Sequence, residues 1–136
     1  MARTRRLPLI GLVSGLALLI SVGTALAASE YVTGSLNTSG SLVQYSTIRT
    51  HAFEGIIDAD IDNLPGNEYL RLGLRNDTNN TQFTLTEQWD VYTLKEFRLS
   101  SNGSNIINAR KFRINGRMEA GCTLFCDNTW GGLMHF

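Results

Sequence analysis

HAFEGIIDADIDNLPGNEYLRLGLRN, residues 51–76, carries the clearest structural signal in the chain. Apolar or small side chains alternate with mostly acidic ones over residues 53–62, and leucines alternate with Arg71, Gly73 and Arg75 over residues 70–75. Strict alternation means that one face of a strand packs into a core while the other meets water. The stretch therefore predicts two β-strands separated by a turn at residues 63–66.

The same pattern predicts that these two strands pair as a hairpin. One register matches the apolar and the charged positions together, and a slip by one residue would lose both matches. Burial of large apolar side chains, at about 1.5–3 kcal/mol each, would outweigh surface ion pairs, at about 0.2–1 kcal/mol each. The expected partners are Ala59 with Leu70, Ile57 with Leu72 and Gly55 with Leu74 on the core side, and Asp58 with Arg71 and Glu54 with Arg75 on the outer side.

The remaining sequence after residue 28 extends this pattern. Short β-prone runs alternate with turns rich in Asn, Ser and Gly, and helix signals are scarce, although residues 89–97 could form a helical turn. Such spacing is typical of a small antiparallel β-sandwich or barrel-like domain, here spanning 28–136. A second hairpin is expected to place Leu74 near Phe83 and Leu72 near Leu85, and the run 106–119 should point Phe112, Ile114, Gly116 and Met118 inward and Lys111, Arg113, Asn115 and Arg117 outward.

The first 27 residues predict a signal peptide. Arg3, Arg5 and Arg6 precede an uncharged stretch at 7–27 that ends in the cleavage signal Ala-Leu-Ala. Arg5 and Arg6 also leave open the twin-arginine route, and the stretch is long enough for an uncleaved membrane anchor. We expect cleavage and a secreted protein that keeps no membrane segment. The product would carry nine basic and twelve acidic side chains, a net charge of −3, which gives no general attraction to nucleic acid.

Cys122 and Cys126, the only cysteines, are expected to form a disulfide in an oxidising compartment. The spacing C-x-x-x-C does not match a redox motif, and zinc would need further ligands. We expect the disulfide to hold a hairpin between the strand ending near residue 120 and a terminal strand. That strand should carry Trp130 into the core, and Gly131-Gly132 would permit a bulge or a close backbone approach.

Two charged groups are candidate ligand sites. Asp60, Asp62 and Glu68 could hold calcium, but the spacing fails the helix–loop–helix pattern, and a solvated acidic stripe is the favoured interpretation, with no cofactor. Arg110 and the alternating cations of the following strand could bind sulfate, phosphate or an acidic glycan; alternatively they keep an edge strand soluble. The three alternating cations are Lys111, Arg113 and Arg117.

Aromatic residues offer a further possibility, a platform on which sugar rings stack, although most aromatics in a small domain belong to the core. The candidates are Trp89, Trp130, Tyr31, Tyr45, Tyr69 and Tyr92.

Function is therefore predicted as non-enzymatic binding of an extracellular ligand or a cell-wall or glycan surface. A secreted antagonist, either antimicrobial or protease-inhibiting through the loop 76–81 or the Cys122–Cys126 loop, is an alternative. A small hydrolase that pairs His51 with Glu54 or Asp58 is less favoured, because no nucleophile motif is present. The expected ligand face comprises Asp58, Asp60, Tyr69, Arg71, Lys111, Arg113 and Arg117.

Overall fold

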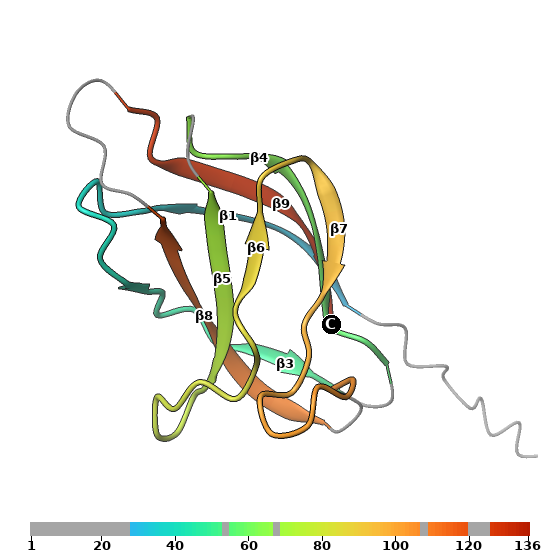
Figure 1. Ribbon diagram of the computed structural model, residues 1–136. Coiled ribbons are helices and arrows are strands. Elements are labelled where there is room, and N and C mark those ends of the chain that lie inside the picture. The colour runs from blue at the N-terminus through green and yellow to red at the C-terminus, as the bar shows by residue number, and fades with distance from the viewer. Residues whose placement is uncertain (1–27, 53–54, 67–68, 107–108, 120–125) are drawn as a thin grey trace, which may run out of the picture.

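The protein is a two-layered antiparallel β-sandwich (Figure 1). A computed structural model describes residues 28–52, 55–66, 69–106, 109–119 and 126–136, and within these ranges it contains no helix. The first sheet consists of β1 (Ser29–Ser35), β9 (Thr129–His135), β4 (Asp58–Asn63) and β7 (Thr93–Glu96), in this spatial order. The second consists of β2 (Val43–Gln44) and β3 (Arg49–His51) along one side of β8 (Arg110–Met118), followed by β5 (Leu70–Asn76) and β6 (Glu87–Trp89).

The strand order identifies the sandwich as a jelly roll. The chain passes repeatedly from one sheet to the other, so that the spatial orders β1-β9-β4-β7 and β2/β3-β8-β5-β6 interleave early and late strands. This is the arrangement produced by two Greek keys. The predicted all-β, two-sheet architecture is thus confirmed. The predicted signal peptide and Cys122 lie outside the described residues, so cleavage and the disulfide with Cys126 stay predictions.

The predicted hairpin between β4 and β5 is wrong. β4 pairs with β9 and β7, whereas β5 pairs with β8 and β6, so the two strands lie in opposite sheets. The expected ion pair of Asp58 with Arg71 does not form, because Asp58 contacts His135 and Arg71 pairs with Glu119 instead. Glu54, the expected partner of Arg75, lies outside the described residues. The leucines of β5 and the apolar residues of β4 are nevertheless buried, since they face each other across the core: Ala59, Ile61, Leu70, Leu72 and Leu74.

The second predicted hairpin, between β5 and the following segment, forms with a shifted register. The Phe83 amide donates to the Leu74 carbonyl at 3.0 Å, as expected, but Leu72 lies opposite Glu87 instead of Leu85. Two extra residues are therefore accommodated on the β6 side. The Leu74 amide donates to the hydroxyl of buried Thr84 at 2.9 Å, so a side chain replaces the missing ladder bond.

β8 and β9 do not form the predicted C-terminal hairpin, because they belong to different sheets. β9 lies between β1 and β4, and Trp130 is buried as expected. The predicted close approach at the two glycines is confirmed. A Cβ on Gly132 would lie 2.8 Å from the Ile61 Cα, and the β4 register shifts beside it, between Ile61 and Asn63.

Aromatic contacts tie the two sheets together. The Trp130 indole N–H donates to the Tyr45 hydroxyl at 2.8 Å, and the rings of Phe112 and Phe136 meet edge to face at 5.5 Å. The inward side of β8 is as predicted, with Phe112, Ile114 and Met118 buried. Among the described residues no helix has the length and hydropathy needed to cross a membrane.

Candidate functional site

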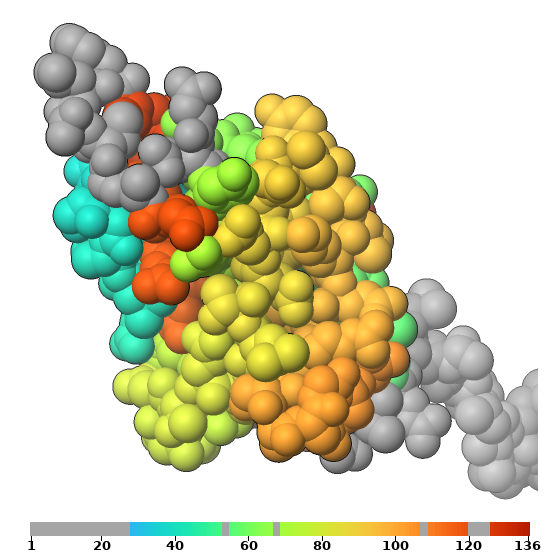
Figure 2. Space-filling model, in the orientation of Figure 1, coloured from blue at the N-terminus to red at the C-terminus, as the bar shows by residue number. Residues whose placement is uncertain are grey.

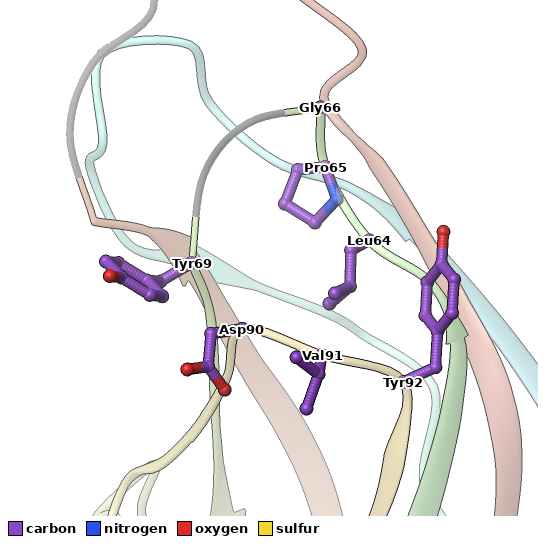
Figure 3. Close-up of a pocket in the computed structure, with 7 residues that line it drawn as sticks. All are labelled: Leu64, Pro65, Gly66, Tyr69, Asp90, Val91 and Tyr92. Atoms are coloured by element: carbon purple, nitrogen blue, oxygen red, sulfur yellow. The ribbon is translucent and has the colours of Figure 1, made fainter.

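A cleft of about 590 Å³ opens at the end of the sandwich where two chain connections meet. One wall is the connection from β4 to β5, and the other is the connection from β6 to β7 (Figure 1). This volume lies within the usual range for small-molecule sites. The cleft is lined by Leu64, Pro65, Gly66, Tyr69, Asp90, Val91 and Tyr92 (Figure 3).

Pairing of β5 with β6 explains why the two walls adjoin. Leu70 lies opposite Trp89, so the next residues outward, Tyr69 and Asp90, leave the two strands at the same level. The Trp89 ring is fully buried, and its indole N–H donates to the Thr93 carbonyl at 2.9 Å. This bond spans the turn at 90–92 and fixes its base to the core.

The β4–β5 wall is also held by backbone hydrogen bonds. The Gly66 amide donates to the Asp127 carbonyl at 2.9 Å, and the Glu119 amide donates to the Tyr69 carbonyl at 3.2 Å. Pro65, which belongs to this wall, is itself buried. Both walls are therefore anchored to regular structure, which gives the cleft a largely preformed shape.

The lining combines two exposed aromatic rings with a carboxylate. Tyr69 is 44 % and Tyr92 68 % exposed, and Figure 3 shows them at opposite sides of the cleft with Leu64 and Val91 between them. Asp90 extends from the same turn as Tyr92. Tyrosine faces offer flat apolar contact, their hydroxyls can donate and accept, and a carboxylate accepts hydrogen bonds. Together these groups suit a ligand with both apolar faces and hydroxyl groups.

The structure does not bring the expected ligand face together. Tyr69 lies in the cleft, but Asp58 and Asp60 lie on the outer side of the first sheet. The remaining members lie on the outer side of the second sheet, on β5 and β8: Arg71, Lys111, Arg113 and Arg117. These residues thus occupy three separate regions.

Among the described residues, no third potential calcium ligand joins Asp60 and Asp62. Asp62 accepts a hydrogen bond from the Tyr31 hydroxyl at 2.6 Å, and this bond raises the pKa of Tyr31 above its ordinary value. Glu68 lies outside the described residues, and no cluster of three potential metal ligands occurs among those that are described. The side chains of Asp60 and Asp62 lie on the outer face of β4.

β8 is an inner strand, so the interpretation of its cations as protection for a sheet edge is wrong. It pairs with β5 on one side and with β2 and β3 on the other. Arg113 and Arg117 thus face away from the core in the middle of a sheet.

His51 is the last residue of β3 and is buried, with only 2 % of its surface exposed. Its Nε2 lies 3.0 Å from the Ile106 carbonyl and therefore carries the proton. Asp58, a proposed catalytic partner, contacts His135 at 2.5 Å on the outer face. Glu54 lies outside the described residues. The geometry offers His51 no accessible substrate position.

A second cavity, of about 570 Å³, lies at the opposite end of the sandwich. Figure 2 shows that end as the adjoining loops 76–82 (yellow-green) and 99–105 (orange), remote from the turn at 90–92 (gold). Its two cations are already engaged. Arg98 pairs with Glu96 at 2.5 Å, and the Arg110 guanidinium stacks 4.3 Å above the Phe83 ring. This cavity is therefore the weaker candidate.

Among the cleft residues, Tyr69 and Tyr92 were candidates from the sequence, whereas Asp90, Val91 and the 64–66 wall were missed. Trp89 and Trp130 proved to be core residues. A usable signal was the apolar pair Val91-Tyr92 between two short strands, since such residues rarely gather in a turn without a packing or binding role. What concealed it was the possibility of a helical turn at 89–97.

No protein-family model matches the chain, and neither a curated protein nor a solved structure is significantly similar to it.

Proposed function

We propose that this chain is an exported, non-catalytic binding domain whose ligand is a saccharide held in the tyrosine-rimmed cleft. The carrying observation is the placement of exposed Tyr69 and Tyr92 on either side of an anchored cleft that also contains Asp90. Sugar rings present apolar C–H faces and hydroxyl edges, which fit tyrosine rings and a carboxylate respectively. Jelly rolls include lectins, but they host many other functions, so the argument rests on the cleft.

Export is supported by the leader at 1–27, which has the order of charge, apolar stretch and cleavage signal that secretion requires. A secreted domain meets cell-wall and matrix polysaccharides directly. The absence of a nucleophile motif in the sequence and the burial of His51 both favour binding over hydrolysis.

The test is binding to a panel of soluble neutral polysaccharides, measured by retardation in polysaccharide-containing native gels and then by calorimetry. Tyr69→Ala and Tyr92→Ala should each weaken binding about tenfold, because stacking on one aromatic face contributes about 1–1.5 kcal/mol. Both side chains are exposed, so the melting temperature should change little.

Tyr31→Ala is the matched control, since it removes an equally exposed tyrosine from the outer side of the first sheet. Saccharide binding should survive in this variant. Binding that persists unchanged in a Tyr69→Ala/Tyr92→Ala double variant with an intact fold would refute the cleft as the site, and no binding across the panel would refute the saccharide.

A secreted antagonist is the second candidate, and the loop 76–81 favours it. The loop is exposed but internally bonded: the Asn76 amide donates to the Thr81 carbonyl at 2.9 Å, and the Thr81 amide donates to Asn79 Oδ1 at 3.0 Å. Rigid loops bind protease clefts with little entropic cost. Inhibition of a protease panel that is lost on replacing 77–80 by glycines, with cleft variants unaffected, would select this function.

A further inference from the structure

The two outer faces of the sandwich carry opposite charges on their inner strands. On β4, three aspartates point outward, in alternation with buried Ala59 and Ile61. On β8, three cations point outward, in alternation with buried Phe112 and Ile114. We name these the acidic stripe, which comprises Asp58, Asp60 and Asp62, and the basic stripe, which comprises Lys111, Arg113 and Arg117.

The basic stripe has no ion-pair partner in the part of the chain that the structure describes. Its cross-strand neighbours on β5 are arginines too, of which Arg71 is itself paired with Glu119. Arg117 lies opposite Arg71, and Arg113 lies opposite Arg75. Burial and, second, repulsion from Arg113 lower the pKa of Arg75. Like charges directly opposite each other destabilise a sheet, so an external anionic surface would relieve this face.

The acidic stripe has the geometry to supply that surface. Residues two apart on a strand are separated by about 6.6–6.8 Å. The three aspartates share this spacing with Lys111 and Arg113, while Arg117 lies two such steps beyond Arg113. Asp58 and Asp62 use one carboxylate oxygen, Oδ1, for the contacts with His135 and Tyr31. A carboxylate has two oxygens and can accept a guanidinium through the other.

Exposed apolar side chains flank the acidic stripe. Asp60 lies in one row with Leu133 of β9 and Leu94 of β7, and both leucines are exposed, by 39 % and 48 %. Burial of exposed leucines adds a hydrophobic contribution to any contact made by the charges. Salt would therefore weaken such a contact without fully removing its driving force.

We propose that the acidic stripe of one copy of this chain docks on the basic stripe of the next. The stripes lie on opposite outer faces of one sandwich, so they cannot meet within a molecule. A contact between two different faces is heterologous, and unless the rotation closes a ring it produces an open head-to-tail chain of copies. This self-assembly is independent of saccharide binding, because neither stripe lines the cleft.

Charge reversal provides the test, read by sedimentation velocity over a concentration series at about 0.02 M and about 0.5 M salt. The natural chain should associate at low salt and dissociate largely at high salt. Arg113→Glu/Arg117→Glu and Asp60→Lys/Asp62→Lys should each sediment as monomers. In an equimolar mixture the two reversed faces become complementary, and association should return.

Ser101→Lys serves as the control, since it changes the charge by one unit on the exposed loop 99–105, outside both stripes, and should leave association intact. Melting temperatures establish that each variant is folded. The proposal fails if the natural chain stays monomeric at low salt, if either reversed variant associates like the natural chain, or if the mixture remains monomeric. Association that is lost only in the arginine variant points to another anionic partner and equally overturns the proposal.

Discussion

β4 and β5 follow one another in the chain and show the same alternation of apolar and charged residues. They nevertheless lie in opposite sheets and present opposite charges on their outer faces. Both bury their alternate apolar residues almost completely, as Ile61 and Leu72 show. β4 turns aspartates outward, while β5 turns arginines toward the arginines of β8. The comparison separates two kinds of information: alternation fixes which side of a strand faces the core, and long-range pairing fixes which strand lies beside it.

The largest expected effect comes from charging the inner side of β5. Leu72→Asp should abolish folding, because the side chain is fully buried and an unpaired carboxylate there has no partner. Arg71→Ala, one residue away on the outer side, should lower stability by only about 0.2–1 kcal/mol, although it removes a 2.6 Å contact with Glu119. Circular dichroism and thermal melting measure both changes. Similar losses in the two variants would contradict the assigned sides of the strand.

The next effect concerns the closest approach between β4 and β9. Gly132→Ala should cost about 1–3 kcal/mol or more, because its Cβ would press on the backbone of Ile61 at 2.8 Å, and backbone cannot move aside cheaply. Gly66→Ala is the matched control, since its Cβ would meet the nearest atom at an ordinary 3.6 Å. Equal urea midpoints for the two variants would argue against the tight contact.

Much of the architecture could be predicted from the sequence, for a physical reason. The inward residues of β4, β5 and β8 follow from local alternation, which any all-β packing must satisfy. The prediction that β4 and β5 pair as a hairpin failed, because the apolar face of a strand is buried equally well in two arrangements. The strand can lie beside its partner in one sheet, or it can face the partner across the two layers of a sandwich. The turn at 63–66 was consequently interpreted as a hairpin loop, although it carries the chain from one sheet to the other.

The cleft was predictable only in part. Tyr69 and Tyr92 could be selected as aromatics, but their proximity depends on the pairing of Leu70 with Trp89, which shifts by two residues from the expected register. That shift arises where Thr84 and Gln82 side chains replace ladder bonds. Side-chain substitutes of this kind leave no mark on the apolar pattern, so sequence reasoning placed the expected ligand face on the wrong combination of strands.

A moderate effect should follow from removing that substitute bond on β5. Thr84→Val keeps the shape of the buried side chain but leaves the Leu74 amide without its 2.9 Å acceptor. An unpaired buried donor costs about 1–3 kcal/mol. Thr84→Ser restores the hydroxyl and should recover most of the hydrogen-bond contribution, which chemical denaturation can measure. If serine is no more stable than valine, packing and not the hydroxyl holds the irregular register.

The smallest effect lies at the start of β9, where the wall of the cleft is fixed. Asp127 Oδ1 accepts from the Thr129 hydroxyl at 2.5 Å and from the Thr129 amide at 2.9 Å, and these bonds, the hydroxyl first, hold the pKa of Asp127 below its ordinary value of 3.8. A lowered folded-state pKa means that the contribution to stability is present above the unfolded value and is lost as the pH falls through the folded value.

Thr129→Val should therefore raise the pKa of Asp127 toward 3.8, as measured by NMR titration of the carboxyl carbon. The backbone bond remains in this variant, so the pKa should rise only part of the way. The small difference in melting temperature from the natural chain at neutral pH should shrink as the carboxyl is protonated in both proteins. A difference that persists unchanged in strong acid would locate the role of Thr129 in packing. It would also mean that the carboxylate contributes little to holding the Asp127 carbonyl beneath Gly66 at the cleft.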